Sequence, residues 1–191
     1  MEFDVLIIGS DANAYYMARC YHELYNKKCY VLAKTPLPYT KYSNILEIYY
    51  DESIWDEDGF LKAIYKFKLD HGDKKTLLIS SNESYATFIS KNKDKLLDDN
   101  FIFNYPDIDI MDSLTMKEKF YKKYQNSSIS IPKTYYFDCK KELSFHNEMT
   151  YPIILKPSNV IMYNHISFSG KNKIYKLNSE EELNNIIKKI I

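Results

Sequence analysis

Short apolar runs recur along the first half of the sequence, and longer segments with apolar residues at helical spacing separate them. The stretch DVLIIGS, at residues 4–10, is continuous, apolar and β-branched, as is typical of a parallel strand buried on both faces. A helical pattern follows at residues 12–28, and CYVLAK, at residues 29–34, reads as a second strand. Closely spaced strands joined by a helix predict a parallel sheet with right-handed crossovers.

The alternation of strand and helix continues to about residue 110. Three further strands are predicted, at residues 43–50, 74–81 and 100–106. Two further helices are predicted at residues 56–70 and 82–97, the first beginning with acidic residues that suit the positive end of a helix. Residues 1–111 are therefore predicted to form one Rossmann-like, doubly wound α/β domain.

The pattern changes after residue 111. One helix and then three strands are predicted, at residues 112–125, 130–138, 151–158 and 173–179. Strands without helices between them favour antiparallel pairing, so residues 112–191 are predicted to form a second module of α+β type. A last helix, at residues 179–191, begins with Ser179 and Glu182 at the spacing of a capping box. Its apolar face reaches the final residue, and we expect this module to be half of a domain.

The composition excludes several classes of protein. Hydrophobic residues make up 45% and charged residues 27%, and the formal net charge is zero, so a general nucleic-acid binder is not expected. The three cysteines and four histidines are scattered without CxxC or HxxxH spacing, which argues against a disulfide framework and a structural zinc site. The N-terminus lacks the pattern of a signal peptide, and no apolar run is long enough to span a membrane. A cytoplasmic protein without a membrane partner is predicted, and its oligomeric state stays open.

The stretch GSDAN, at residues 9–13, falls in the predicted turn between the first strand and the first helix. Such a turn presents backbone N–H groups and the positive helix end to an anion. The dinucleotide motif GxGxxG is absent, and the carboxylate of Asp11 would repel a pyrophosphate. Ser10, Asp11 and Asn13 are therefore candidates for binding a small carboxylate or amine substrate. A simple helix-capping role for Asp11 is an equal alternative.

Two lysines, Lys117 and Lys156, are candidates for binding phosphate. Lys156 ends the apolar run of YPIILKPSN, and Lys117 lies near the start of a lysine-rich helix. A phosphate site needs fixed positive charge and a loop whose amides can surround oxygen atoms, and SFSGKNK at residues 167–173 offers such a loop around Gly170. The pattern alone leaves a solvated helix face, a snorkelling lysine and an ordinary hairpin turn as alternatives for these features.

The order of these features resembles the beginning of the ATP-grasp fold. A lysine-bearing helix is followed by IPKT and a strand, then YPIILKP, a glycine loop, a further strand and NSEEEL. Within this superfamily the chain is most similar to carboxylate–amine ligases, in particular those of the peptidoglycan D-aspartate ligase type. The similar segments are GSDANAYYMARCYHE (9–23), SKNKDKL (90–96), KEKFY (117–121), IPKTYYF (131–137) and YPIILKPSN (151–159).

The resemblance implies a fold and a reaction. Residues 1–111 would be a pre-ATP-grasp domain, and residues 112–191 would be a first, incomplete ATP-grasp nucleotide-binding subdomain. Ligases of this kind phosphorylate a carboxylate with ATP, and an amine then attacks the acyl phosphate to give an amide. The chain would be the N-terminal fragment of such an enzyme, inactive by itself, and the enzyme would ligate a small amino acid or carboxylate, with cell-wall precursor synthesis as one setting.

The resemblance also implies roles for individual residues. By matching position, Lys156 would contact the α- and β-phosphates and the adenine edge of ATP, and Lys117 would contact phosphate. Ser169 and Gly170 would lie in the loop that closes over the phosphates. The chain departs from the family here, because Gly170 is the only glycine of its loop. No catalytic residue of the chain follows from the resemblance.

Magnesium is the second cofactor that the resemblance implies, and its ligands are expected beyond residue 191. Glu180, Glu181 and Glu182 could be considered as metal ligands, but their place at a helix start favours capping. Two other functions stay open. One is a non-catalytic α/β module that binds a small metabolite or a protein at the GSDAN edge. The other is a Rossmann-like nucleotide-sugar transferase, which would leave the order of the lysines unexplained.

Overall fold

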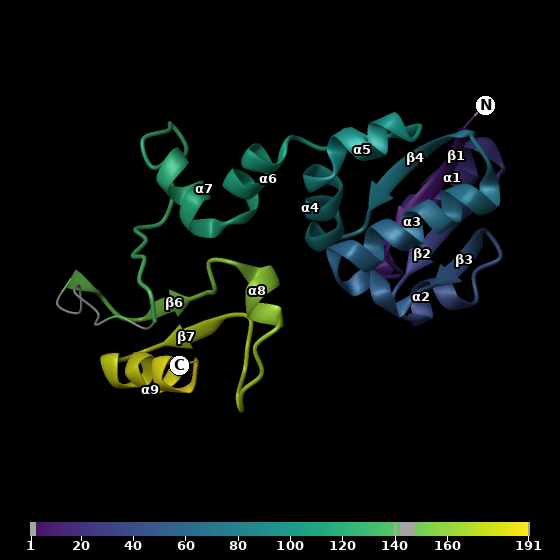
Figure 1. Ribbon diagram of the computed structural model, residues 1–191. Helices are drawn as coiled ribbons and strands as arrows, with labels where there is room; N and C mark the ends of the chain where they lie inside the picture. The colour runs from purple at the N-terminus through teal and green to yellow at the C-terminus, as the bar shows by residue number, and fades with distance from the viewer. Residues whose placement is uncertain (1–2, 140, 142–147, 191) are drawn as a thin grey trace. The chain divides into compact units, whose positions relative to one another are not determined.

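The computed structural model describes residues 3–139, 141 and 148–190 of the chain (Figure 1). The chain divides into two compact units, Met1–Met111 and Asp112–Ile191. The boundary between them falls inside helix α6 (Ile108–Thr115). Each unit has its own sheet, with five strands described in the first and two in the second.

The first unit is built on a parallel sheet with the strand order β3-β2-β1-β4-β5. Its strands are β1 (Phe3–Ile8), β2 (Cys29–Ala33), β3 (Leu46–Tyr50), β4 (Lys75–Ser80) and β5 (Phe101–Ile102). The chain proceeds outward from β1 to β3 and then returns past β1 to β4, so the direction of winding changes between β1 and β4. The predicted doubly wound α/β sheet is confirmed.

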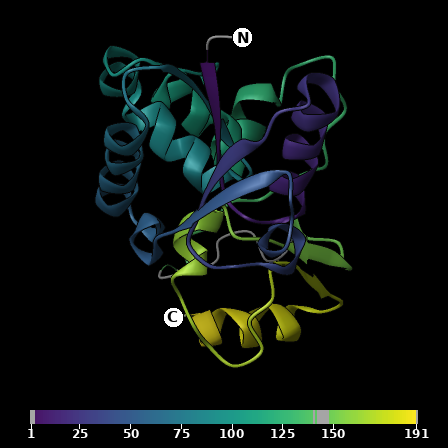
Figure 2. The ribbon, with the colours of Figure 1, turned by 90° about the vertical axis from the view of Figure 1, so that its right-hand side faces the viewer.

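Helices cover both faces of this sheet (Figure 2). Side chains along β1 alternate between two cores, because successive residues of a strand point to opposite faces. Val5 belongs to the core beneath α1 (Ala12–Tyr25), whereas Leu6 belongs to the core beneath α3 (Glu57–His71) and α4 (Glu83–Lys91). The remaining helices that lie within the first unit are α2 (Pro38–Lys41), the 3₁₀ helix η1 (Glu52–Trp55) and α5 (Lys93–Asp98).

Side-chain caps begin the long helices of the first unit. Asp56 accepts a hydrogen bond from the N–H of Gly59 at the start of α3, and Asn82 accepts from the first turn of α4. Gly59 is also required by a close approach, since a Cβ atom there would lie 1.9 Å from the carbonyl oxygen of Ser53. The capping of the helix after residue 81 by an asparagine agrees with the sequence-based prediction.

The second unit contains a small antiparallel sheet of β6 (Ile153–Leu155) and β7 (Tyr175–Leu177). Helix α9 (Glu180–Ile190) packs against this sheet through Leu183 and Ile187. Two further helices are α7 (Lys117–Tyr124) and α8 (Val160–Asn164). The predicted antiparallel pairing in an α+β module is confirmed.

The strand predicted at residues 130–138 is wrong. The described residues of this segment form no strand and no helix. Pro132 has no N–H to donate to a ladder, and the hydroxyl of Thr134 donates to the carbonyl oxygen of Pro132 at 2.8 Å. Local hydrogen bonds of this kind compete with strand pairing.

Several helix boundaries also differ from the prediction. The helix predicted at residues 112–125 is two helices, because Met116 has an extended backbone and separates α6 from α7. The helix predicted at residues 82–97 also divides into two, at Asn92, whose backbone is neither helical nor extended. Helix α8 was not predicted, since its five residues are too few to show a helical period. The strand predicted at residues 100–106 has two residues only.

Candidate functional site

The candidate substrate residues Ser10, Asp11 and Asn13 follow directly after β1. They lie at the carboxyl edge of the sheet, next to the point where the direction of winding changes between β1 and β4. Ligands of open α/β sheets bind preferentially at such a point, because the loops on the two sides diverge there and leave a crevice. The position of these residues in the fold is therefore the one at which a small-ligand site is expected.

Asp11 is a helix cap with a second hydrogen bond. Its Oδ1 accepts from the N–H of Ala14 at 3.0 Å, which caps α1. Its Oδ2 accepts from the hydroxyl of Ser81, also at 3.0 Å, in the turn after β4. The capping alternative is confirmed. Each carboxylate oxygen has a second lone pair, so Asp11 can still accept a hydrogen bond from an ammonium group.

Ser10 and Asn13 differ in their exposure. Ser10 is buried, and its hydroxyl donates to the carbonyl oxygen of Thr35 at 2.8 Å, which fixes the loop after β2. Asn13 is exposed, and its Nδ2 donates to the carbonyl oxygen of Ser81 at 3.3 Å. Asn13 is therefore better placed to touch a ligand with its side chain, whereas Ser10 shapes the loop.

Gly9 allows the turn after β1 to approach the turn after β4. Its φ is +114°, and a Cβ atom at this position would lie 2.0 Å from Oγ of Ser81. Backbone hydrogen bonds join the same edge, from the Gly9 N–H to Leu32 and from the Ser81 N–H to Ile8, each 2.9 Å long. The ends of β1, β2 and β4 are thus linked into one rim.

Sequence reasoning missed two residues of this rim. Ser81 holds both Asp11 and Asn13, and the hydroxyl of Tyr105 accepts from the N–H of Ser80 at 2.7 Å. A signal for Ser81 was present, because the polar triplet SSN follows a buried strand just as GSDAN does. No local signal distinguishes Tyr105, whose contact spans 25 positions.

The start of α7 and the segment after β6 lie together in the second unit. The backbone N–H of Lys117 donates to the carbonyl oxygen of Ser158 at 3.2 Å, and the N–H of Glu118 donates to Oγ of Ser158 at 3.2 Å. Ser158 comes two residues after Lys156, so residues 40 positions apart meet here. The two candidate phosphate residues are therefore attached to neighbouring backbone segments.

The side chains of these two lysines are available to a ligand. Lys117 is half-buried and Lys156 is exposed. Among the described residues, no ion pair joins either lysine to a carboxylate. Since Ser158 already accepts from the first two N–H groups of α7, an anion would be held by the ammonium groups rather than by those amides.

The candidate glycine loop has a fixed base and an open tip. Ser169 and Gly170 are exposed, and Gly170 has a φ of +80°. At the base, the hydroxyl of Tyr175 accepts from the N–H of Asn172 at 2.7 Å and lies 2.9 Å from the hydroxyl of Tyr163. Burial and this contact with Tyr175 raise the pKa of Tyr163. The loop does not close a simple hairpin, because α8 lies between β6 and the loop.

The three glutamates at the start of α9 are part of a capped helix end. Oγ of Ser179 accepts from the N–H of Glu182 at 3.2 Å, as the predicted capping box requires. The reciprocal bond is shifted by one residue, since the Glu182 carboxylate accepts from the N–H of Asn178 at 2.8 Å. Within residues 3–139, 141 and 148–190, no group of three or more metal-binding side chains occurs. No helix in that part of the chain is both long and apolar enough to cross a bilayer.

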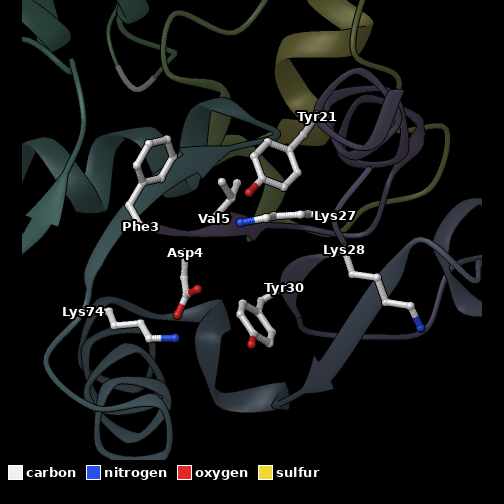
Figure 3. Close-up of a pocket in the computed structure, with 8 residues that line it drawn as sticks. All are labelled: Phe3, Asp4, Val5, Tyr21, Lys27, Lys28, Tyr30 and Lys74. Atoms are coloured by element: carbon white, nitrogen blue, oxygen red, sulfur yellow. The ribbon is translucent and has the colours of Figure 1, made fainter. Parts of the chain in front are cut away.

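A cavity of about 330 Å³ opens at the amino edge of the first unit's sheet, where lysine and tyrosine side chains surround it (Figure 3). None of the residues singled out from the sequence lines it. It lies at the opposite end of β1 from the GSDAN turn, since Phe3, Asp4 and Val5 contribute to its wall.

Comparisons with known proteins agree with this fold. No family model matches the chain. The chain is 30% identical over 196 residues to a D-aspartate ligase from Enterococcus faecium (strain Aus0004), and the alignment covers 99% of this chain and 46% of that protein. Its structure is similar to a crystal structure of L-amino acid ligase from Bacillus licheniformis, with a TM-score of 0.64 and 12% identity, covering 97% of this chain and 41% of the other.

The chain thus resembles the N-terminal portion of ATP-grasp carboxylate–amine ligases, as the sequence predicted. Its fold, a Rossmann-like α/β unit followed by a smaller α+β unit, matches part of the fold of that L-amino acid ligase. The chain spans about half the length of the curated relative that it matches.

Proposed function

We propose that this chain supplies the amino-acid site and part of the ATP site of a carboxylate–amine ligase. The proposal rests on the hydrogen bonds from the start of α7 to Ser158. These bonds hold the backbone of Lys117 next to the segment that carries Lys156. The similarity to two amino-acid ligases over nearly the whole chain supports it.

In the proposed reaction, a carboxylate oxygen of one substrate attacks the γ-phosphorus of ATP. The bond from this phosphorus to the β–γ bridging oxygen breaks, ADP leaves, and an acyl phosphate forms. The amine of the second substrate then attacks the acyl carbon and loses a proton, and inorganic phosphate leaves. The products are an amide, ADP and phosphate, and an amino acid provides either the carboxylate or the amine.

The second unit would hold the phosphates of ATP. Lys117 and Lys156 would act as point charges on the phosphate oxygens, a role that suits the compact ammonium group. The exposed tip at Ser169 and Gly170 would fold over the same oxygens with its backbone N–H groups. Magnesium, when bound, would neutralise part of the phosphate charge, and the part of the chain that the structure describes holds no group of three or more His, Cys, Asp or Glu side chains to which it could be assigned.

The rim of the first unit would hold the amino acid. Asp11 would accept a hydrogen bond from the substrate ammonium, and Asn13 would contact it from the exposed side of the turn. The first N–H groups of α1 would face the substrate carboxylate, which the positive helix end favours. Ser10 and Ser81 would keep these groups in position. We also propose a cytoplasmic reaction that serves cell-wall precursor synthesis, on the resemblance to ligases of that type.

The proposal is tested with the full-length gene product, ATP, magnesium and a panel of amino acids, by following phosphate release. D-aspartate comes first in the panel, because the relative from Enterococcus faecium is named for it. Lys156→Ala should weaken ATP binding by about tenfold to a hundredfold, which corresponds to roughly 1.5–3 kcal/mol for a charge-assisted contact. Lys156→Arg should not restore the affinity fully, because the planar guanidinium has a different shape.

The matched control is Lys188→Ala, which removes an exposed lysine on α9 of the same unit. It should leave ATP binding unchanged. Equal ATP affinity of Lys156→Ala and the parent protein would show that Lys156 is a solvated surface residue. Absence of phosphate release with every amino acid would favour the non-catalytic α/β binding module instead.

A further inference from the structure

The cavity at the amino edge of the first unit's sheet gathers charged and phenolic side chains from separate turns. Asp4 comes from β1, Lys27 and Lys28 come from the turn between α1 and β2, and Lys74 comes from the turn before β4. Parallel strands begin at the same edge of a sheet, so lysines that precede different strands meet there. Tyr21 and Tyr30 complete the polar wall.

The turn that carries Lys27 is held in place by its neighbours. Asn26 ends α1 in the left-handed conformation, with a φ of 50°, and its N–H donates to the carbonyl oxygen of His22 at 2.7 Å. Nδ1 of His22 in turn donates to the carbonyl oxygen of Lys27 at 2.9 Å. The ammonium group of Lys68 donates to the carbonyl oxygen of Lys74. Both lysine-bearing turns therefore have defined backbone positions.

The cavity has an excess of positive charge. Three lysines and one aspartate line it, and among the described residues no ion pair joins Lys27, Lys28 or Lys74 to a carboxylate. Figure 3 shows the side chains of Lys27 and Lys74 extending toward the phenols and Asp4, whereas Lys28 extends away from them. Lys27 and Lys74 thus supply the inner charge and Lys28 the outer charge.

Tyr21 and Tyr30 are hydrogen-bond donors at neutral pH. Burial, together with nearby acidic groups that include Asp4, raises the pKa of each phenol, so both keep their protons. Their rings are held by aromatic contacts, with Tyr21 5.1 Å from the ring centre of Tyr25 and Tyr30 4.5 Å from that of His71. No hydrogen bond to another described residue occupies either hydroxyl.

We propose that this cavity binds a small oxyanion with at least two negative charges, such as a phosphate compound or a polycarboxylate. Lys27 and Lys74 hold its charges, and the hydroxyls of Tyr21 and Tyr30 donate to its oxygens. The carboxylate of Asp4 repels an anion that has no hydrogen-bond donor. It would accept a hydrogen bond from a donor group on the natural ligand. Asp4 in the cavity wall and Gly9 in the GSDAN turn are five residues apart, which corresponds to about 17 Å along the strand at about 3.3 Å per residue. The cavity is therefore a site separate from the proposed amino-acid site at that turn.

Amide NMR shifts of the 191-residue chain can locate the binding. Pyrophosphate and citrate are titrated separately at constant ionic strength, and the amides of Asp4, Val5, Lys27 to Tyr30 and Lys74 are followed. We expect shifts that saturate with a Kd below about 1 mM, the range of a weak specific site. Saturation by pyrophosphate assigns a phosphate ligand, and saturation by citrate assigns a polycarboxylate.

Variants that remove positive or negative charge from the cavity should change the affinity for the anion in opposite directions. Lys27→Gln/Lys74→Gln should weaken binding at least tenfold, while Asp4→Asn should strengthen it because a repelling charge is removed. The control Lys62→Gln/Lys95→Gln removes the same charge from two exposed lysines of the same unit and should leave binding unchanged. A merely structural role of these side chains would not produce opposite signs.

Three outcomes would overturn the proposal. They are shifts that never saturate with either probe, an equal loss of affinity in the control variant, and weaker binding in Asp4→Asn. The variant Lys117→Gln/Lys156→Gln tests whether anion binding in the cavity is independent of the proposed ATP site. Loss of the cavity shifts in that variant would also count against an independent site, whereas unchanged shifts support it.

Discussion

The two units of the chain differ in how their candidate sites are supported. The first unit has cores on both faces of a five-stranded parallel sheet, and its candidate substrate turn is tied to three strand ends. In the second unit, the described residues form two strands of three residues each and one small core. Its buried hydrophobic residues among those described are Tyr163, Tyr175, Leu177, Leu183 and Ile187.

The comparison shows that two glycine turns, at Gly9 and at Gly170, can differ in how tightly their surroundings pack against them. A Cβ at Gly9 would clash with the side chain of Ser81, so the turn after β1 has no room for a side chain at this position. Among the described residues, a Cβ placed at Gly170 would have only Nζ of Lys189 within reach, at 4.0 Å. Since buried apolar area provides most of the stability of a fold, we expect the second unit to be the less stable of the two.

The largest expected effect comes from removing core side chains. Phe60→Ala in the first unit should lose about 3–5 kcal/mol of unfolding free energy, and Leu183→Ala in the second about 2–5 kcal/mol. Both side chains are fully buried. The single tryptophan, Trp55, lies in η1 next to α3 and reports unfolding of the first unit by its fluorescence in urea. Reactivity of the Cys139 thiol, which packs against the small core, reports the second unit.

The comparison requires that the two variants act on different transitions. Phe60→Ala should shift the tryptophan transition, and Leu183→Ala should shift the thiol reactivity alone. The control is Leu69→Ala, since Leu69 is 84% exposed and should change neither. If each variant shifted both signals equally, the two units would unfold in a single transition. The two units would then not differ in stability, contrary to our expectation.

A second test replaces a glycine in each unit. Gly9→Ala combines left-handed backbone strain of about 1–2 kcal/mol with a clash against Ser81, so we expect a total loss above about 2 kcal/mol. Gly170→Ala has the strain without the clash and should lose about 1 kcal/mol. Gly72→Ala is the matched control in the first unit, because its φ is +74° and no atom of the described residues lies within 4 Å of a Cβ placed there. Similar losses at Gly9 and Gly72 would contradict the tight approach of the two turns.

A third test separates the cap from the substrate role at Asp11. Asp11→Ala should lose about 1 kcal/mol, as removal of a helix N-cap does, whereas Asp11→Asn keeps the cap. If the proposed ligase activity is found, Asp11→Asn should raise KM for the amino acid more than KM for ATP. Asp56→Asn changes another cap of the same unit and should raise neither. Equal changes of both constants in Asp11→Asn would leave Asp11 with the capping role only.

The smallest expected effect is a loss of stability at low pH. Hydrogen bonds from the hydroxyl and the N–H of Ser53, 2.6 and 2.9 Å long, lower the pKa of Asp51. Burial opposes ionisation of Glu57, but hydrogen bonds from Lys91 and Asn92 outweigh it and lower that pKa too.

A lowered pKa in the folded state stabilises the protein above the unfolded-state pKa, here about 4, and this stabilisation disappears as the pH falls through the folded-state value. Both groups are partly exposed, so the contribution should stay below about 1 kcal/mol. Urea midpoints from tryptophan fluorescence between about pH 6 and pH 3 measure it. Asp51→Asn/Glu57→Gln should flatten the decline, and an unchanged slope would contradict these assignments.

Local patterns were enough to find the main elements of the first unit. The strands β1, β2 and β4 lie where short apolar runs predicted them, because a strand covered on both faces must be apolar throughout. The predicted caps followed from residues that bond to the backbone two or three positions away. In the second unit, the strand predicted at residues 130–138 failed because an apolar, aromatic run predicts a strand only if a partner is available for pairing.

The sequence by itself determined the strands and helices of the first unit and predicted candidate site residues, namely the polar turn after the first strand, the two lysines and the glycine loop. Only the tertiary structure decided what stands beside them. The bond from Ser81 to Asp11 spans 70 positions and the bond from Glu118 to Ser158 spans 40. The lysine-lined cavity likewise depends on the order of β2, β1 and β4 in the sheet. Such contacts join residues that are far apart in the sequence and form only when the sheet assembles and closes the long loops between them. A local sequence pattern therefore cannot predict them.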